Sequence, residues 1–130
     1  MVQEGDIKVV NSIVIICEDG PFGKNSVVES IRMAAGLLAV GDVEICKVIL
    51  LREAVSFLNK SLAPEALNMN NFDNILRLIE LSELEIYVHN EAIENLGLEF
   101  SDLILHDNVK VVDMKEIAQL ILNTDMSFKY

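Results

Sequence analysis

The sequence predicts an α/β fold, a single three-layer α/β/α sandwich around a mainly parallel five-stranded sheet. Apolar runs typical of buried strands alternate with segments whose apolar residues recur at helical spacing. Strands that alternate with helices are joined by right-handed crossovers, which produce parallel strands with helices on both faces. The 130 residues contain no linker, repeat or low-complexity tract, so we expect one domain over residues 1–130.

The first half of the chain is expected to supply two strands and two helices. Residues 12–17 are an apolar run and predict a buried strand, and residues 26–39 follow with one apolar helical face. Gly41 suits the end of this helix because glycine accepts the left-handed backbone of a C-cap. Residues 43–51 begin as an alternating strand and end apolar, and a short helix is predicted from Glu53 to Leu58.

The second half continues the same alternation. Residues 59–71 are the least regular segment and predict a surface excursion beside the strand tips. The elements expected after it are a helix over 72–81, a strand over 85–89, a helix over 91–96 capped by Gly97, a strand over 109–112, a helix over 114–122 with Asp113 as its N-cap, and a last strand over 125–128.

Charge restricts the partners that the surface can attract. The formal net charge is −11, so the surface potential opposes phosphate backbones and anionic lipid. We therefore expect neither nucleic acid nor a membrane as partner. The polar and acidic start of the sequence does not resemble a secretory signal. Cys17 and Cys46 lie in separate apolar strands, which favours free thiols and a cytoplasmic location.

The junction between the first strand and the first helix is the leading candidate site. Parallel sheets place ligands beyond the carboxyl ends of their strands, where helix N-termini offer unpaired N–H groups. The junction reads EDGPFGKNS over residues 18–26 and superficially resembles a phosphate loop. That motif has four residues between its glycines and Ser or Thr directly after its lysine, whereas two residues separate the glycines here and Asn25 follows Lys24. The acidic pair Glu18 and Asp19 also argues against phosphate, although it lies where ligands bind.

Cys17 and His89 are the candidate chemical groups near the strand tips. A helix N-terminus can hold a thiol as thiolate, but the neighbouring carboxylates oppose this effect, and cysteine is more often part of the core. Cys46 lies in mid-strand and is expected in the core. His89 closes the third strand and can bind an anion, shuttle a proton, cap the next helix or face solvent. Neither His89 nor His106 has a metal-ligand partner at suitable spacing, so no metal site is expected.

The order of motifs along the chain resembles the DsrE/DsrF/TusC family of sulfur-relay proteins. The first strand leads into Pro21-Phe22-Gly23 and a helix with Glu29 and Ala34-Ala35, which is similar to the start of the family pattern. The closing pattern is more specific and consists of Ile86-Tyr87-Val88, EAIENLGL over 91–98, Asp102-Leu103-Ile104, VKVVD over 109–113 and TDMSF over 124–128. The resemblance covers nearly the whole chain and is weakest over residues 59–71.

The resemblance implies a small α/β subunit of dimers, trimers or hexamers whose active relatives carry sulfur as a cysteine persulfide. Active DsrE-like subunits have their cysteine just after the third strand, near His89 and Asn90 of this chain, where no cysteine is present. In this respect the sequence is similar to DsrF- and TusC-like subunits, which serve assembly or docking. The residues expected to bind a ligand or partner are Glu18, Asp19, Phe22, Gly23, His89 and Asn90.

Three functional hypotheses remain at this point. We prefer a non-catalytic subunit, without a cofactor, that forms a homo-oligomer or a hetero-oligomer with thiol-bearing DsrE-like subunits and helps to bind a sulfur-carrier protein. The second hypothesis is a persulfide-carrying sulfurtransferase in which Cys17 is the catalytic residue, assisted by the helix N-terminus and His89. The third is a small-molecule sensor with a pocket formed at the strand tips by the junction and residues 59–71.

Overall fold

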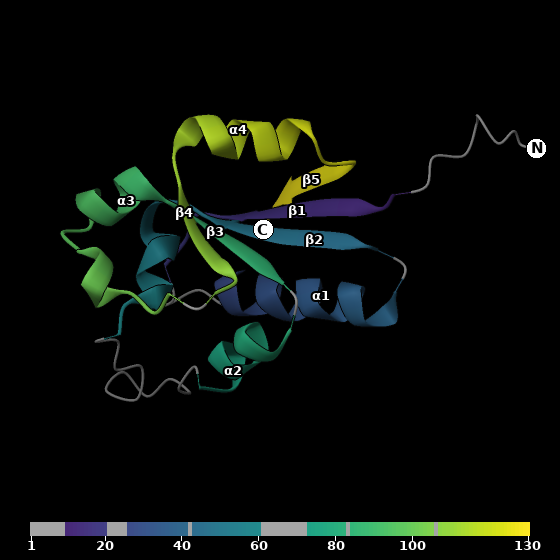
Figure 1. The fold of residues 1–130 in the computed structure, drawn as a ribbon, viewed down its shortest axis with the longest axis horizontal. Helices are drawn as coiled ribbons and strands as arrows, with labels where there is room; N and C mark the ends of the chain where they lie inside the picture. Colours follow the sequence, from purple (N-terminus) through teal and green to yellow (C-terminus); the bar gives the residue numbers. More distant parts are fainter. Residues whose placement is uncertain (1–9, 21–25, 42, 61–72, 83, 106) are drawn as a thin grey trace, which may run out of the picture.

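One parallel sheet organises the chain, and the predicted α/β sandwich is confirmed (Figure 1). The computed structural model describes residues 10–20, 26–41, 43–60, 73–82, 84–105 and 107–130. Its five strands lie in the order β4-β3-β2-β1-β5, and every pairing is parallel. The strands are β1 (Ser12–Cys17), β2 (Ile45–Leu50), β3 (Glu85–His89), β4 (Val109–Val112) and β5 (Met126–Lys129).

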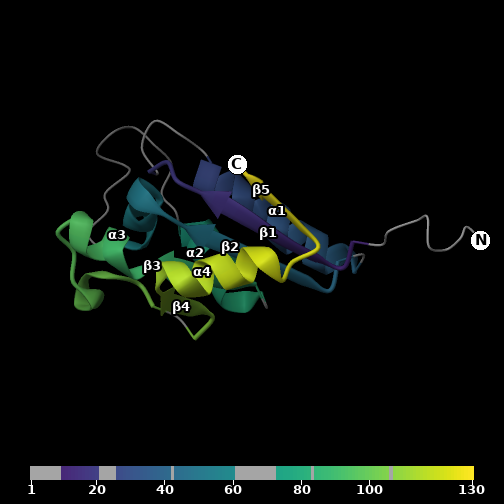
Figure 2. The same ribbon diagram turned by 90° about the horizontal axis from the view of Figure 1, so that it is seen from above.

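Helices cover the two faces of the sheet unequally. The helical elements are α1 (Ser26–Val40), η2 (Arg52–Leu58), α2 (Asp73–Leu81), α3 (Asn90–Asn95), η4 (Phe100–Asp102) and α4 (Met114–Leu122), of which η2 and η4 are 3-10 helices. Helices α1 and α2 lie on one face and α4 lies on the opposite face, while η2 and α3 lie toward the carboxyl ends of the strands (Figure 1). Seen from above, β1 and β5 lie to one side of α4 (Figure 2). The α4 face is therefore only partly covered.

Two hydrophobic clusters reflect this difference between the faces. The larger cluster includes Ile13, Ile15, Val48 and Ile86, and it is closed by residues of α1, α2, η2 and α3. The smaller cluster lies beneath α4 and consists of Val14, Ile49, Tyr87, Val112 and Ile117. Alternation along each strand assigns its residues to the two clusters in turn. The α4 face thus has a small core with room beside it.

The termini of three helices follow from single residues, as predicted. The Asp113 side chain accepts a hydrogen bond of 2.8 Å from the Glu116 backbone N–H and caps α4. Gly41 and Gly97 adopt φ values of +86° and +72°, the left-handed conformation that ends α1 and α3. Among the described residues, no helix is long and apolar enough to cross a membrane.

Several predicted boundaries shift by one or two residues. Strand β2 begins at Ile45 instead of Val43, and β5 runs from Met126 to Lys129 instead of 125–128. The short helix predicted after β2 is the 3-10 helix η2, which begins at Arg52 instead of Glu53, and η4 was not predicted. Most of the irregular segment 59–71, the first residue of the expected helix 72–81, and the predicted site residues Phe22 and Gly23 lie outside the described part of the chain.

Candidate functional site

Cys17, the predicted catalytic candidate, lies inside the larger core at the end of β1. Its side chain has 0% relative exposure. The thiol donates a hydrogen bond of 3.1 Å to Ser30 Oγ, and the Ser30 hydroxyl donates one of 2.6 Å to the backbone carbonyl of Ser26. Burial raises the pKa of Cys17, the Ser30 hydrogen bond lowers it by less, and the Asp19 carboxylate raises it further. Cys17 is therefore a neutral, enclosed thiol at neutral pH.

Cys46 is the second of the two cysteines in the sequence and is also buried. It lies in β2, has 3% relative exposure and packs in the larger core. Burial alone raises its pKa to about 11. Both thiols of the chain are therefore free and shielded from solvent.

Glu18 and Asp19 follow β1 directly and have different surroundings. Glu18 Oε1 lies 2.5 Å from Lys129 Nζ, and its Oε2 lies 3.5 Å from Arg52 Nε. The hydrogen bond from Lys129, reinforced by both positive charges, holds the pKa of Glu18 below its usual value. Asp19 is exposed. Glu18 therefore connects β1, β5 and η2, whereas Asp19 faces solvent.

His89 and Asn90 lie where β3 passes into α3. The His89 side chain is 12% exposed, and its Nε2 lies 3.6 Å from Glu91 Oε1. Within the described residues this nitrogen is buried and has no hydrogen-bond partner. Asn90 Oδ1 accepts a hydrogen bond of 2.7 Å from the Glu91 backbone N–H. The turn thus presents one imidazole and one amide beside an exposed carboxylate.

The structure does not bring His89 and Cys17 together. Strand β2 separates β1 from β3, so the two residues are not on neighbouring strands. Cys17 aligns with Leu50 and Leu50 with Val88, and all three belong to the larger cluster. His89 is the next residue after Val88, and strand alternation directs it to the opposite face. His89 is therefore not placed to assist the Cys17 thiol.

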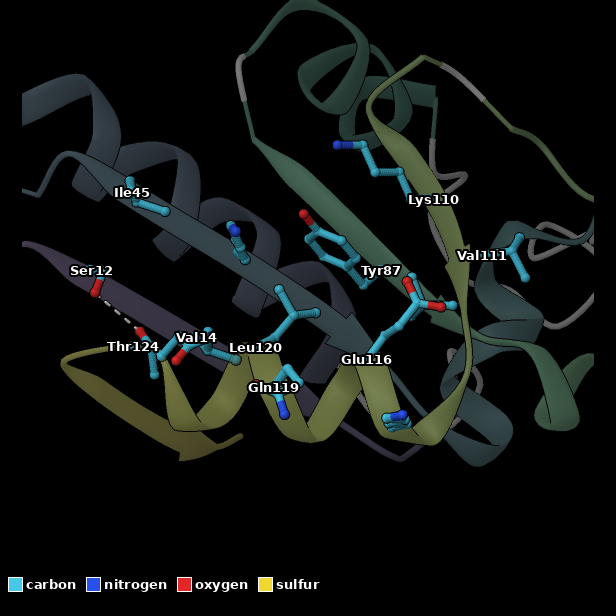
Figure 3. Close-up of a pocket in the computed structure, with 14 residues that line it drawn as sticks. Ser12, Val14, Ile45, Tyr87, Lys110, Val111, Glu116, Gln119, Leu120 and Thr124 are labelled. Carbon is cyan, nitrogen blue, oxygen red and sulfur yellow. Dashed lines mark hydrogen bonds between the residues drawn. The ribbon is translucent and has the colours of Figure 1, made fainter.

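A pocket on the α4 face was not predicted from the sequence. Its volume is about 890 Å³, and residues of β1 to β4 and of α4 line it. Figure 3 shows Leu120 directed from α4 toward the sheet, with Tyr87 and Lys110 at one end of the pocket and Ser12 and Thr124 at the other. The pocket lies across the sheet from the enclosed Cys17 thiol.

A charged cluster surrounds Tyr87 at one end of this pocket. The Tyr87 hydroxyl donates a hydrogen bond of 2.8 Å to Glu85 Oε1. Lys47 Nζ lies 3.6 Å from the same oxygen, and Lys110 Nζ lies 3.4 Å from Glu85 Oε2. The two ammonium groups lie 5.4 and 5.8 Å from the centroid of the Tyr87 ring. Two positive charges thus share one carboxylate and one aromatic ring.

The register of the sheet explains this cluster. Lys47 aligns with Glu85, and Tyr87 aligns with Lys110, so all four side chains project from one face. The hydrogen bond from Tyr87 is the main cause that lowers the pKa of Glu85, and both lysines add to it. Burial and the same carboxylate raise the pKa of Tyr87. Sequence alternation places Glu85 and Tyr87 on one face, but only the strand order adds the lysines.

The described residues do not form a metal centre. No group of three or more His, Cys, Asp or Glu side chains in the described ranges could hold a metal ion. The chemistry that the described residues offer is therefore a set of ion pairs at the strand tips and a cationic, partly apolar pocket beneath α4.

Comparison with known proteins gives a family match and several similar solved structures, two of which are given below. The family model described as "DsrE/DsrF-like family" matches residues 11–129. No curated protein sequence matches the chain. The crystal structure of the ychN protein from E. coli is 21% identical, with a TM-score of 0.75, over 92% of this chain and 99% of that one. A protein of unknown function from Methanobacterium thermoautotrophicum, MTH1491, is 14% identical, with a TM-score of 0.66, over 92% of this chain and 98% of that one.

Proposed function

The chain belongs to the DsrE/DsrF-like family, and from this premise we propose that it is a subunit of a sulfur-relay system that acts in assembly or partner docking. In this role it does not carry sulfur on a thiol of its own. The burial of both cysteines is the observation that carries the proposal.

Persulfide transfer requires a thiolate that a sulfur donor can reach. The nucleophile in such an exchange is the thiolate, and attack depends on access as well as on pKa. Cys17 has 0% relative exposure, and burial raises its pKa, so both conditions oppose its reaction. No cysteine lies at His89 or Asn90, where the resemblance places the thiol of active DsrE-like subunits. These residues support a role without sulfur carriage.

Docking at the strand tips requires polar groups that a partner can contact. Asp19 and Glu91 are exposed and Asn90 is partly exposed, whereas the His89 side chain is only 12% exposed and its Nε2 is buried. We assign these groups to contact with a thiol-bearing DsrE-like subunit, a second copy of this chain or a sulfur-carrier protein. The free buried thiols suit the reducing cytoplasm, where we place the relay.

Thiol labelling and native mass determination test this role together. The native protein should show no fast reaction with a disulfide reagent at mild alkaline pH, and both thiols should react after unfolding in denaturant. After exposure to a persulfide donor, the native mass should not gain a sulfur atom. The native assembly should be larger than a monomer, alone or with a thiol-bearing DsrE-like subunit.

The variant Cys17→Ser separates the docking role from the alternative sulfurtransferase. A sulfur adduct that forms on the native wild-type chain, but not on Cys17→Ser, would identify Cys17 as the sulfur carrier and overturn the docking role. Cys46→Ser is the matched control because Cys46 is also buried but lies near the start of β2, away from the strand tips. A protein that remains monomeric with every such partner would also contradict the proposal.

A further inference from the structure

The pocket beneath α4 has the shape and charge of a small-molecule site. We propose that it binds a small organic anion, a molecule with an apolar or aromatic body and one carboxylate or similar acidic group. This site is separate from the strand-tip residues to which the docking role is assigned.

The size and lining of the pocket suit a small apolar body. Its volume of about 890 Å³ lies within the range of small-molecule sites. Val14 and Val112 contribute aliphatic walls from the sheet, and Leu120 contributes one from α4. Leu120 packs against the smaller core, which includes Val14, Tyr87 and Val112, and is itself only partly buried. The apolar body of the ligand would therefore cover the part of this sheet face that α4 leaves uncovered.

The charges of the pocket specify an anion. Among the described residues that line it, Lys47, Lys110 and Lys115 are basic and Glu116 alone is acidic. If Glu85 is added, because it pairs with two of these lysines, three ammonium groups still face two carboxylates. This local positive excess contrasts with the net charge of −11 for the whole chain. The pocket therefore attracts the charge that most of the surface repels.

The position of Lys47 and Lys110 locates the acidic group of the ligand. Both ammonium groups pair with Glu85, one with each oxygen, so a second carboxylate can pair with the positive charge that Glu85 leaves uncompensated. The Lys47 side chain is only 25% exposed, so an ion pair there is less screened than one at the open surface. We therefore place the acidic group of the ligand beside Lys47 and Lys110, at the Tyr87 end of the pocket.

The opposite end of the pocket is lined by polar, uncharged side chains, and the Asp125 carboxylate beside it accepts a hydrogen bond of 3.2 Å from the Ser12 backbone N–H. There the Thr124 hydroxyl donates a hydrogen bond of 3.3 Å to Ser12 Oγ (Figure 3). Gln119 and Asn123 of the α4 region also contribute to the lining. The two ends are thus different, so the pocket orients a ligand that has one acidic end.

A pair of fluorescent probes that differ only in charge tests the proposal. 8-Anilinonaphthalene-1-sulfonate carries an acidic group, and N-phenyl-1-naphthylamine has the same aromatic body without it. We expect the sulfonate to bind more tightly, and its affinity to fall with added salt. The double variant Lys47→Gln and Lys110→Gln should weaken binding of the sulfonate about tenfold and leave the neutral probe within about twofold.

Two controls make the measurement specific to the pocket. Lys60→Gln removes one positive charge, against two in the double variant, at an exposed lysine outside the pocket and should leave both affinities unchanged. Gln119→Trp places a large ring in the pocket and should weaken both probes, whereas Ala118→Trp, at the exposed neighbouring residue outside the lining, should not. Because Gln119 is exposed, the larger side chain of Gln119→Trp should not disturb folding. This variant therefore tests whether the probes bind in the pocket even if the double lysine variant fails to fold.

Three results would overturn the proposal. The first is no saturable binding of the sulfonate to the native protein. The second is sulfonate binding that neither the double lysine variant nor Gln119→Trp weakens. The third is equal affinity for both probes at low salt. None of these results bears on the thiol measurements that test the docking role, so the two proposals can fail separately.

Discussion

Lys129 Nζ lies 2.5 Å from Glu18 Oε1, and this ion pair joins the end of β5 to the residue that follows β1. The other carboxylate oxygen lies 3.5 Å from Arg52 Nε, at the start of η2. The Tyr130 backbone N–H also donates a hydrogen bond of 2.9 Å to the Ile16 carbonyl. Glu18, which the sequence marked as a ligand-binding carboxylate, therefore holds three separate segments of the chain together.

Glu18→Gln should lower the free energy of unfolding at neutral pH, by less than about 1 kcal/mol because the ion pairs are partly exposed. The pKa of Glu18 is lowered by folding, so its contribution is fully present above the unfolded value of about 4.3 and disappears as pH falls through the lower folded value. Urea denaturation of both proteins across this range measures the difference. Glu94→Gln, at an exposed glutamate of α3, is the control. A difference that persists unchanged at acidic pH would contradict the assignment.

Asn108→Ala should destabilise the fold by about 2 kcal/mol, because it removes one side-chain donor from each of two backbone carbonyls, and among the described residues only that of Ile79 keeps another, the Ser82 hydroxyl at 3.4 Å. Asn108 Nδ2 donates hydrogen bonds of 2.6 Å to the Ile79 carbonyl and 2.7 Å to the Leu84 carbonyl. Asn108→Asp should be worse than Asn108→Ala at neutral pH, since a carboxylate has no proton to donate to these oxygens. Denaturant midpoints measure the series.

Asn95→Asp introduces the same negative charge as Asn108→Asp at an exposed position of α3, so it controls for the effect of the added charge alone. If Asn108→Asp is as stable as Asn108→Ala or more stable, then the side-chain amide of Asn108 is not the donor that joins α2 to the residue before β3.

Gly36, inside a helix, and Gly97, just beyond the end of one, should respond to alanine in opposite directions. Gly36 lies inside α1, is exposed, and an added Cβ would meet no atom within 4 Å, so Gly36→Ala should stabilise the protein by about 1 kcal/mol. Gly97 has φ +72°, so Gly97→Ala should cost about 1 kcal/mol through backbone strain even though the space is open. Thermal unfolding of both variants measures the signs. If both variants shift the unfolding temperature in the same direction, then either Gly36 is not inside a helix or Gly97 is not a left-handed helix cap.

Tyr87→Phe should raise the pKa of Glu85, because the Tyr87 hydroxyl is the main group that lowers it. The same change should destabilise the fold by about 1 kcal/mol through loss of one hydrogen bond of 2.8 Å. NMR titration of the Glu85 carboxyl measures the first effect, and denaturation measures the second. Tyr130→Phe, at an exposed tyrosine, is the matched control. An unchanged titration of Glu85 in Tyr87→Phe would show that Tyr87 does not set its pKa.

Local sequence predicted the elements of this fold well because each has a local cause. The apolar run of β1, the Asp113 cap of α4 and the left-handed Gly97 all depend on a few neighbouring residues. The 3-10 geometry of η2 was missed because its buried residues recur three positions apart, Ala54 with Phe57 and Val55 with Leu58, a spacing that suits either helix form. Boundaries of β2 and β5 shifted because pairing with β1, and not composition, decides where each strand begins.

The candidate site was harder to predict because it depends on strand order. Cys17 and His89 both follow from the sequence as strand-end residues, but only the order of β1, β2 and β3 shows that a strand separates them. Lys47 and Lys110 look like ordinary surface lysines in the sequence. Their convergence on Tyr87 results from the register of three strands that are far apart along the chain.

The position of β5 has a consequence for how the chain is made. Ile13 of β1 aligns with Met126 of β5, so one side of β1 stays unpaired until ribosomal synthesis has passed every other described strand. Contacts so distant in sequence are slow to form, and an unpaired strand edge is prone to join another chain. During translation, the nascent chain therefore exposes the edge of β1 for longer than any other edge that the finished sheet will cover.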